Sequence, residues 1–490
     1  MVEDLTPFRT EFNGSLRLEG RTEPLTSETG AIVLRDVMER IDIIPWFVEH
    51  LEDPRKPEFI THPLSELLRT SLLLVGLGWR DQDDADQLRN DAVLRLSVSD
   101  RKGLGPLETR APRQDGRPLS KNPVVPDGLA SQPTLSRFTR TLSTGGNRAA
   151  LRLGLLEVAA RRVRTLRRGH RFRYLTVDVD SLPVEVHGEQ PGSKYNGHYH
   201  CQMYHPIVAS VAETGDLLDV HLREGNVHTA DGGIDFVLPL LDDIEHELCQ
   251  VAAVRIDAGF PEETFLGALE GRGTPYVARI KNNAVLNRMA EPFLKRPVGR
   301  PPSEPRTWFY EMTYAAGTWS HARRVVLVVL ERPEQAELDH FWLITNWTSA
   351  EMDGPALLEM YRERGTAEGY MGELMDVFRP ALSSAARPKS HYRGKVLENQ
   401  SPPIDAFAHN EVILLLNAIA YNIAHAGRAL MEIATGEGWS LRRFRERALR
   451  VASRVVVHSR RATVILAEGP TKLWHALWLR LAAVRFVPSS

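Results

Sequence analysis

The chain has 490 residues, 42% hydrophobic and 25% charged, with a formal net charge of −2, which is typical of a globular protein of about three structural units. Its two cysteines exclude a disulfide framework and a four-cysteine zinc site within one chain. The start lacks the basic and apolar segments of a signal peptide, and no apolar run approaches the roughly 18 residues of a membrane span, so we expect a cytoplasmic protein without a membrane partner.

Residues 1–170 are expected to form a helical region that binds DNA or dimerises. Apolar residues recur at helical spacing in 32–44 and 64–74. Residues 103–130 are rich in Gly, Pro and charge and are expected to form a loop. A serine and a proline at 131–133 predict the start of a helix, whose short polar and basic side chains suit DNA recognition. A surface helix of an all-α bundle is the alternative.

From residue 171 the pattern changes to strands that alternate with helices. Three strands with a tight turn before the last predict an antiparallel meander, followed by two helices and two further strands. The order βββαβαβ predicts an α/β protein with an RNase H-like mixed-sheet core over 171–285 and 351–430. The expected strands are 174–187, 206–212, 217–222, 251–257 and 276–280, and the helices are 233–249 and 261–270.

A β-rich insertion subdomain is expected to interrupt this core over residues 286–350. Three segments within it, 308–314, 324–330 and 341–347, are rich in β-branched and aromatic residues. The chain then returns to helices at 355–378 and 410–430, and the second is long and apolar enough to back the sheet. Residues 431–490 are expected to form a basic helical region.

Arginines gather in two stretches, 148–173 and 442–461, and each stretch contains a single acidic residue, Glu157 in the first and Glu446 in the second. Each stretch alone fits a solvated helix face. Two such stretches on either side of a carboxylate-rich middle are better explained by contact with nucleic acid.

Three carboxylates are placed as a metal site requires. Asp180 and Asp257 lie near the ends of predicted strands, and Glu368 lies on a predicted helix within the pattern Tyr361-x2-Arg364-x3-Glu368. A few hard oxygen ligands that leave room for phosphate suit Mg²⁺ or Mn²⁺. An Arg and a Glu four residues apart also fit a plain surface ion pair.

The first metal ligand has a competitor on the same strand. Asp178 precedes Asp180 by two residues, so both side chains are expected on one face of the sheet. Strand periodicity alone leaves the choice between them open.

These pieces together resemble the DDE transposases of bacterial insertion sequences that carry a β-strand insertion before the last acidic residue, specifically the insertion-sequence thirteen-eighty family. The resemblance implies that Asp180, Asp257 and Glu368 are the catalytic residues and hold two Mg²⁺ ions. Ser181 matches the small hydroxyl residue that follows the first aspartate of the family. The matching segments are 81–91, 129–137, 178–188, 192–200, 204–206, 255–260, 361–368 and 420–422.

The resemblance implies a transposase that binds the terminal inverted repeats of its element, cleaves at the element ends and joins them to target DNA. Its partner is then double-stranded DNA, held by a homodimer because two ends must be kept together. A nuclease that cuts without joining and a domesticated DNA-binding protein are the alternatives. A glycosidase with paired carboxylates leaves the arginine stretches unexplained.

Phosphate contacts are expected from Tyr361 and Arg364 on the glutamate helix. A related family signature places a lysine seven positions after the glutamate, where this chain has Met375. We therefore expect Arg379 to supply that contact instead.

A histidine-rich segment is expected to lie beside the active site and to contact DNA through His198 and His200. The same segment continues to Cys201 and His205, whose spacing also fits a zinc site.

Two further DNA contacts are expected from the insertion. Trp319 can stack on a base extruded from the duplex, although the pattern favours a tryptophan of the core or surface. Arg296 and Arg300 flank a Gly-Arg-Pro segment like that of peptides that enter the A·T minor groove, although a short basic linker also has this composition.

Overall fold

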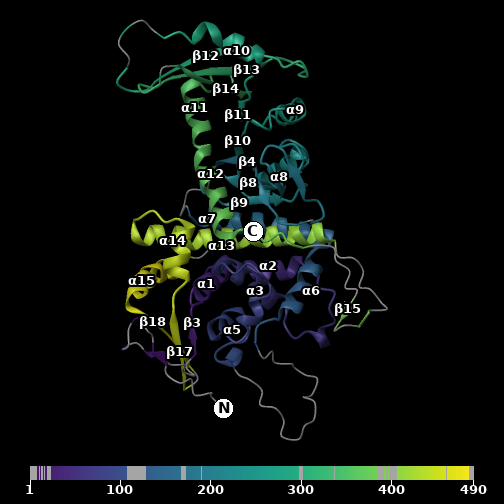
Figure 1. Ribbon diagram of the computed structural model, residues 1–490, viewed down its shortest axis with the longest axis vertical. Helices are drawn as coiled ribbons and strands as arrows, with labels where there is room; N and C mark the ends of the chain where they lie inside the picture. Colours follow the sequence, from purple (N-terminus) through teal and green to yellow (C-terminus); the bar gives the residue numbers. More distant parts are fainter. Residues whose placement is uncertain are drawn as a thin grey trace. The chain divides into compact units, whose positions relative to one another are not determined.

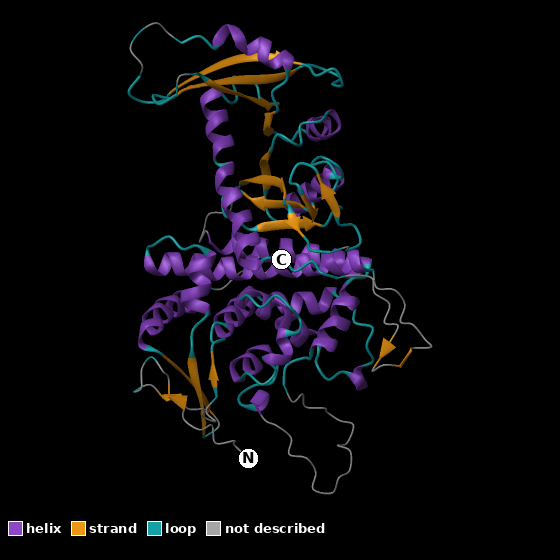
Figure 2. Ribbon diagram, in the orientation of Figure 1, coloured by secondary structure: helices purple, strands orange, loops and turns teal. Residues whose placement is uncertain are grey.

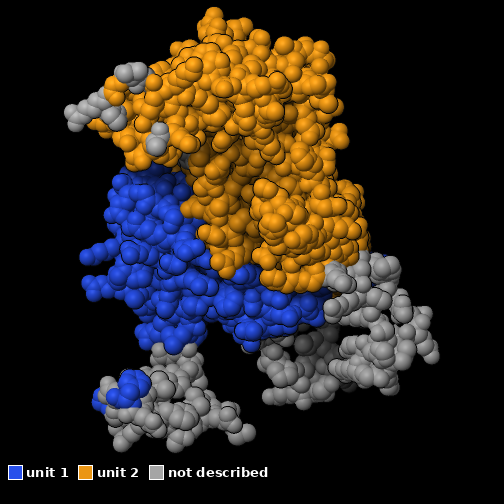
Figure 3. Space-filling model, turned by 45° about the horizontal axis from the view of Figure 1, so that its top comes forward, with its two compact units in different colours: residues 1–37, 55–136, 427–483 blue, residues 38–54, 137–426, 484–490 orange. Residues whose placement is uncertain are grey.

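The computed structural model describes residues 24–107, 128–166, 173–188, 190–296, 299, 302–335, 337–384, 405–459 and 461–484, together with 8–9, 12, 15, 17–18, 391–392 and 395–396. The chain divides into two compact units (Figure 3). Unit 1 comprises Met1–Val37, Arg55–Ser136 and Gly427–Ala483, and unit 2 comprises Met38–Pro54, Arg137–Ala426 and Val484–Ser490.

Unit 2 is built on a mixed eight-stranded sheet with the order β12-β13-β14-β11-β10-β4-β8-β9 (Figure 1). Two neighbouring pairs, β4 with β10 and β10 with β11, are parallel, and all other neighbouring pairs of this sheet are antiparallel. The strands are β4 Tyr174–Ser181, β8 Ile207–Val211, β9 Leu217–His221, β10 Gln250–Ile256, β11 Tyr276–Ile280, β12 Arg306–Tyr314, β13 Arg323–Glu331 and β14 Asp339–Thr345.

The predicted order of elements in the core is confirmed. After the meander β4, β8 and β9 come helix α8 (Gly233–Glu247), β10, helix α9 (Glu263–Arg272) and β11. One departure lies between β4 and β8, where the chain forms a separate three-stranded sheet of β5 (Val184–Glu185), β6 (Lys194–Asn196) and β7 (Cys201–Tyr204). The expected first strand therefore ends at Ser181, not at residue 187.

Apolar residues on alternate strand positions divide the sheet into two buried faces. One face packs with α7 (Gly145–Leu166), α8 and α9, through residues such as Val177, Val254 and Leu241. The other face packs with α11 (Gly354–Arg362) through Val277, Leu343 and their neighbours. Figure 1 shows α8 and α9 on one side of the core strands and α11 on the other. Polar residues on the α11 side of β4 thus face a helix and not bulk solvent.

The strands of the expected insertion do not form a subdomain of their own. β14 pairs antiparallel with β11, from Val277↔Thr345 to Ile280↔Trp342, and β13 and β12 continue from it. Figure 2 shows these strands leading on from the core sheet. The three strands lie within the expected residues 286–350, but they extend the core sheet and so cover the edge that β11 would otherwise leave unpaired.

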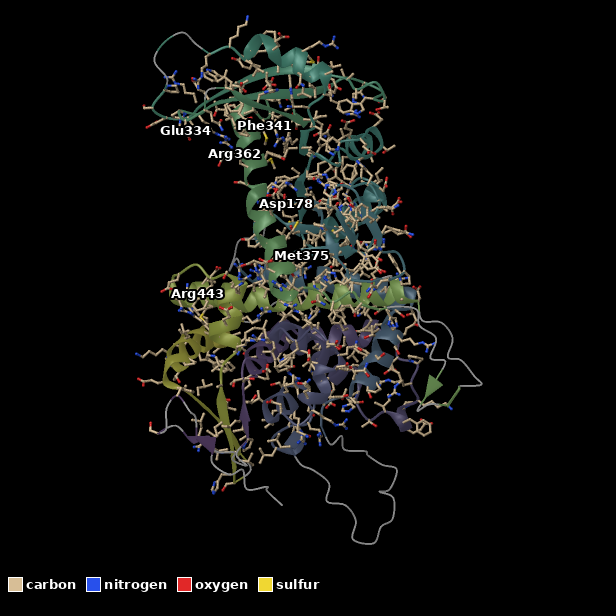
Figure 4. The ribbon with its side chains drawn as sticks, in the orientation of Figure 1. Asp178, Glu334, Phe341, Arg362, Met375 and Arg443 are labelled. Carbon is tan, nitrogen blue, oxygen red and sulfur yellow. The ribbon has the colours of Figure 1, made fainter. Side chains whose placement is uncertain are left out.

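A broken helical stretch follows β14. α11 begins after Asp353, whose carboxylate accepts a hydrogen bond of 2.9 Å from the backbone N–H of Ala356. α12 (Arg364–Glu373) continues from it and ends in a π-helical turn, Leu374–Phe378. Figure 4 labels Arg362 and Met375 on this stretch and Asp178 on the sheet beside it.

The opposite edge of the sheet is covered by α13 (Ala406–Thr435). The Asn422 amide donates to the Leu217 carbonyl at 2.8 Å and accepts from its N–H at 2.9 Å, as a neighbouring strand would. Among the described helices, α13 is the one long and apolar enough to cross a membrane, and 89% of its apolar window is buried inside the protein. It thus backs the sheet, as predicted.

Unit 1 joins the two ends of the chain. β3 (Leu25–Thr26) pairs with β17 (Ser453–His458), which pairs with β18 (Arg461–Leu466). Gly30 lies so close to Leu449 that an added Cβ would be 2.3 Å from its Cα atom, so only glycine fits there. The helices of this unit include α3 Leu64–Leu77, α5 Ala92–Val98, α14 Leu441–Phe444 and α15 Glu468–Ala483. Two more helices, α1 Ala31–Ile41 and α6 Gln132–Leu142, contribute to both units.

The expected terminal regions need two corrections. Residues 431–490 are not purely helical, because the β-branched run Val455–Val457 forms strand β17 of a hairpin. The region 1–170 is not one unit either, since residues 38–54 and 137–170 belong to unit 2. Pairing between segments more than 400 residues apart, such as β3 with β17, is invisible to local composition.

Candidate active site

Two of the three candidate carboxylates lie at the same edge of the central sheet. β4 and β10 are parallel and Val179 is paired with Ile256, so Asp180 and Asp257 are the next residues on adjacent strands. Asp257 Oδ1 accepts a hydrogen bond of 2.7 Å from the Gly259 N–H, which orients the carboxylate. Parallel strands thus bring together side chains that lie far apart in the sequence.

Glu368 reaches this pair through an arginine. The Arg364 guanidinium, on the same helix, donates from Nη1 to Glu368 Oε1 at 2.6 Å and from Nη2 to Asp180 Oδ2. The Arg364 side chain is 9% exposed, whereas that of Glu368 is 59% exposed. The pattern Arg-x3-Glu therefore joins the helix to the strand and is not a plain surface ion pair.

The electrostatics of Asp180 show how close the carboxylates are. Burial raises the pKa of Asp180 to about 6; Arg364 opposes this rise, while the negative charges of Asp257 and Glu368 add to it. Burial lowers the pKa of Arg364, but Asp180 and the other nearby anionic groups outweigh this and raise it. The site thus holds more negative charge than Arg364 neutralises.

Asp178 is engaged elsewhere. Both of its oxygens accept hydrogen bonds from Arg255, at 2.6 Å from Nε and 2.7 Å from Nη2, and Asp178 is 1% exposed. Arg255 also donates from Nη1 to the Met360 carbonyl at 2.9 Å, at the end of α11. This buried bidentate pair connects the sheet to α11 and leaves Asp178 no oxygen directed at the other carboxylates.

The carboxylates of the site are the donor type that divalent ions such as Mg²⁺ prefer. Asp180 and Asp257 offer hard carboxylate oxygens side by side, and a cation would relieve the repulsion that raises the pKa of Asp180. Among the residues that the structure describes, no three His, Cys, Asp or Glu side chains are grouped closely enough to hold an ion. The donor types suit a divalent ion, but the described carboxylates are not gathered around one point, because Glu368 is bonded to Arg364.

Tyr361 lies near the same carboxylates. Its side chain is partly buried and packs against the hydrophobic cluster that contains Leu357. Burial raises the pKa of Tyr361, Arg364 and Arg279 oppose the rise, and Asp257 and Glu368 add to it. Its phenol therefore lies within electrostatic range of the carboxylates.

His198 and His200 lie in the exposed turn between β6 and β7. His200 has φ 56°, a left-handed conformation that turns the chain sharply. The zinc alternative fails, because His198, His200, Cys201 and His205 are all described and form no metal-binding group.

Two residues of the site escaped the sequence analysis. Tyr199 lies between the two histidines; burial raises its pKa, and Asp180 and Asp257 add to the rise, so the turn presents Tyr199 to the carboxylates. Arg223 is 7% exposed and donates from Nη2 to Ser181 Oγ at 3.0 Å, directly beside Asp180. An arginine directly after a buried strand was the available signal for Arg223.

Trp319 and Arg379 lie at different borders of this region. Trp319 lines a cavity of about 450 Å³ together with Pro261–Thr264, the segment that follows Asp257, and the Arg323 guanidinium lies 4.9 Å from its ring centroid. Arg379 is exposed after the π-helical turn, with φ 44°.

The Gly-Arg-Pro segment is only partly described. Arg296 Nε lies 3.1 Å from Glu331 Oε1, and its Nη2 donates to the Gln335 carbonyl at 2.6 Å, so this arginine is tied to the end of β13. Arg300 lies outside the described residues.

Five described arginines of the first stretch, all on α7, are engaged in ion pairs. Arg162 and Asp216 make a buried ion pair, with side chains 4% and 0% exposed. Arg148, Arg152, Arg161 and Arg164 likewise pair with Glu411, Asp219, Glu157 and Glu247. Carboxylates within the protein thus neutralise these residues of α7, four of them from outside the helix and one, Glu157, from the helix itself.

Comparisons with known proteins identify the family of the chain. The sequence profile of the family described as Transposase DDE domain group 1 matches residues 8–385. A solved piggyBac transposase synaptic complex with hairpin DNA is similar over 92% of this chain and 80% of that chain, with 11% identity and a TM-score of 0.37. No curated protein matches. Because the profile spans most of its length, the chain belongs to the transposase DDE domain family, group 1.

Proposed function

We propose that this protein is a DNA transposase of the insertion-sequence thirteen-eighty type, with an RNase H-like core that binds terminal inverted repeats, cleaves at the element ends and joins them to target DNA. The observation that carries the proposal is the cluster of Asp180, Asp257 and Glu368 around Arg364 in a chain of the DDE family. Such a protein works on DNA in the cytoplasm.

The three carboxylates are the proposed ligands of Mg²⁺ or Mn²⁺. When bound, the two ions activate the attacking oxygen and stabilise the leaving oxygen of the phosphodiester. Asp180 and Asp257 hold their oxygens fixed at the sheet edge, and the exposed Glu368 completes the set from α12. Arg364, released from the carboxylates, offers a guanidinium to the phosphate.

The remaining proposed DNA contacts surround this centre. Tyr361 lies next to it, and Tyr199 approaches from the turn that also carries His198 and His200. Trp319 lines its cavity beside the Asp257 loop and is placed to receive an extruded base. Arg379 is exposed and is proposed to contact the phosphate backbone. Arg296 and Arg300 are proposed to contact DNA outside the centre.

A nuclease that cuts without joining is the second candidate, because one carboxylate cluster serves both reactions. A duplex that carries the inverted repeat, incubated with protein and Mg²⁺, separates the two. A transposase yields cut ends and joined products, a nuclease yields cut ends only, and a domesticated DNA-binding protein yields a gel shift without cleavage.

The matched control is a pair of single variants, Asp257→Asn and Asp178→Asn. Asp257→Asn is expected to abolish cleavage and to retain binding of the repeat, because the fold keeps an isosteric side chain. Cleavage by Asp257→Asn at the wild-type rate would refute the proposed centre. Asp178→Asn, if folded, is expected to keep cutting.

A further inference from the structure

The C-terminal hairpin has one face that is exposed along its whole length. The register pairs Arg454 with Ile465, Val456 with Thr463 and His458 with Arg461, and directly opposed residues share a face of a hairpin. Every one of these six side chains is exposed, including Val456 at 37% and Ile465 at 41%.

The opposite face of the hairpin is the packed one. Ser453 and Val455 are buried there, and their partners Leu466 and Val464 are partly buried. Val457, on this side near the tip, is 50% exposed, so the hairpin is anchored at its base and less packed at its tip. The fully exposed face carries two aliphatic residues, a threonine and basic residues at both ends.

The charge of this face has a single sign. No Asp or Glu occurs from residue 448 to residue 467, while Arg450, Arg454 and Arg461 fall in that span. At the base of the hairpin, Arg447 and Arg450 line a cavity of about 410 Å³ with Glu446. Burial lowers the pKa of the nearby Arg445, and the positive charges of Arg450, Arg80 and Arg442 lower it further.

We propose that this exposed ribbon face, Arg454, Val456, His458, Arg461, Thr463 and Ile465, docks onto duplex DNA in the major groove. The inference rests on the proposed function and adds to it a binding surface in unit 1, outside the carboxylate centre. The basic residues at the two ends of the face, in a stretch of sequence without Asp or Glu, are complementary to phosphate.

The dimensions of the ribbon agree with this partner. A two-stranded ribbon fits the major groove, which is about 12 Å wide. A strand rises about 3.4 Å per residue, so Arg454 and His458 lie roughly 14 Å apart along the ribbon. This distance corresponds to about four successive phosphates along the axis of one DNA strand. The arginines can thus reach phosphates while Val456, Thr463 and Ile465 face the base edges.

The test is the salt dependence of binding to an inverted-repeat duplex without Mg²⁺, followed by fluorescence anisotropy. For the full-length double variant R454A/R461A, we expect the slope of log K against log salt to fall by about 2, because two phosphate contacts are lost. Its affinity at 150 mM salt is expected to fall at least about tenfold. The variant R454K/R461K, which keeps the charge, is expected to keep the slope.

A matched control removes two positive charges from exposed positions of α15 in the same unit, Lys472→Ala and Arg480→Ala. Its slope is expected to match the wild type. Equal losses in the control and in R454A/R461A overturn the inference, and so does an unchanged slope in R454A/R461A.

Two further readouts separate this inference from the proposed function. If wild-type protein cuts the duplex with Mg²⁺ while R454A/R461A binds normally, the ribbon inference fails and the transposase proposal stands. If wild-type protein neither binds nor cuts, both fail. A changed mass by light scattering with unchanged DNA binding would identify the ribbon as a protein interface and overturn the inference.

Discussion

Arg364 supplies the positive charge that the carboxylate centre requires when no ion is bound. It bonds to Asp180 and Glu368 at once, yet the pKa of Asp180 remains raised, because burial and the charge of Asp257 exceed this single compensation. The centre therefore stores unfavourable electrostatic energy that a divalent cation would relieve.

Asp180→Asn is therefore expected to stabilise the ion-free protein at pH 7.5. Folding raises the pKa of this carboxyl from 3.8 to about 6, so the folded state binds its proton more tightly than the unfolded state does. The stabilisation that results is complete below pH 4 and is lost as pH rises through 6. An ionised Asp180 then costs about 3 kcal/mol, which the neutral amide avoids. Thermal melts should show a higher Tm for Asp180→Asn at pH 7.5 and little difference at pH 4.5.

Mg²⁺ and a neighbouring variant provide the controls. Added Mg²⁺ should raise the Tm of the wild type and leave that of Asp180→Asn nearly unchanged. Asp178→Asn should destabilise the protein by about 3 kcal/mol, because Arg255 stays charged and buried without its carboxylate. A lower Tm for Asp180→Asn at pH 7.5 would contradict this account.

At the scale of elements, the two arginine stretches have different roles. Those of α7 are neutralised by carboxylates from the sheet and from α13, and so hold a helix against strands. Those of the β17–β18 hairpin lie on an exposed face. Local composition is similar in the two stretches, and only the partners brought by the fold distinguish them.

Arg162→Met is expected to destabilise unit 2 by about 3–5 kcal/mol, because Asp216 would stay buried without its guanidinium. Urea unfolding measures this loss. DNA affinity of the folded fraction should remain that of the wild type, unlike that of R454A/R461A.

The double variant R162M/D216L should recover most of the lost stability, since a buried ion pair replaced by apolar side chains is often neutral. Failure to recover, or a reduced salt slope of DNA binding in Arg162→Met, would show that Arg162 does more than pair with Asp216.

At the scale of the whole molecule, each chain offers one cluster of Asp180, Asp257 and Glu368. Joining two element ends to a target requires two such clusters at once, which leads to the proposed homodimer in the DNA complex. The α13 helix and the β3–β17 pairing connect segments from both ends of the chain.

Light scattering with inverted-repeat DNA measures the stoichiometry. We expect a complex with two chains and two DNA ends. A complex of one chain with one end that still yields joined products would refute the dimer.

The sequence by itself determined the order of strands and helices, the strand ends that carry Asp180 and Asp257, and the helix that carries Glu368. These features depend on alternation, helical spacing and turn residues within about ten positions, where local physics dominates. The catalytic roles of the three residues stay a prediction, while their proximity is a property of the structure.

Only the tertiary structure decided between residues with the same local pattern. Asp178 and Asp180 share a strand face, but Arg255, 77 residues later, binds Asp178 and leaves Asp180 beside Asp257. Tertiary pairing likewise neutralised the arginines of α7, exposed the hairpin and joined the expected insertion to the central sheet. Burial and charge compensation arise from residues far apart in the chain, so no local pattern encodes them.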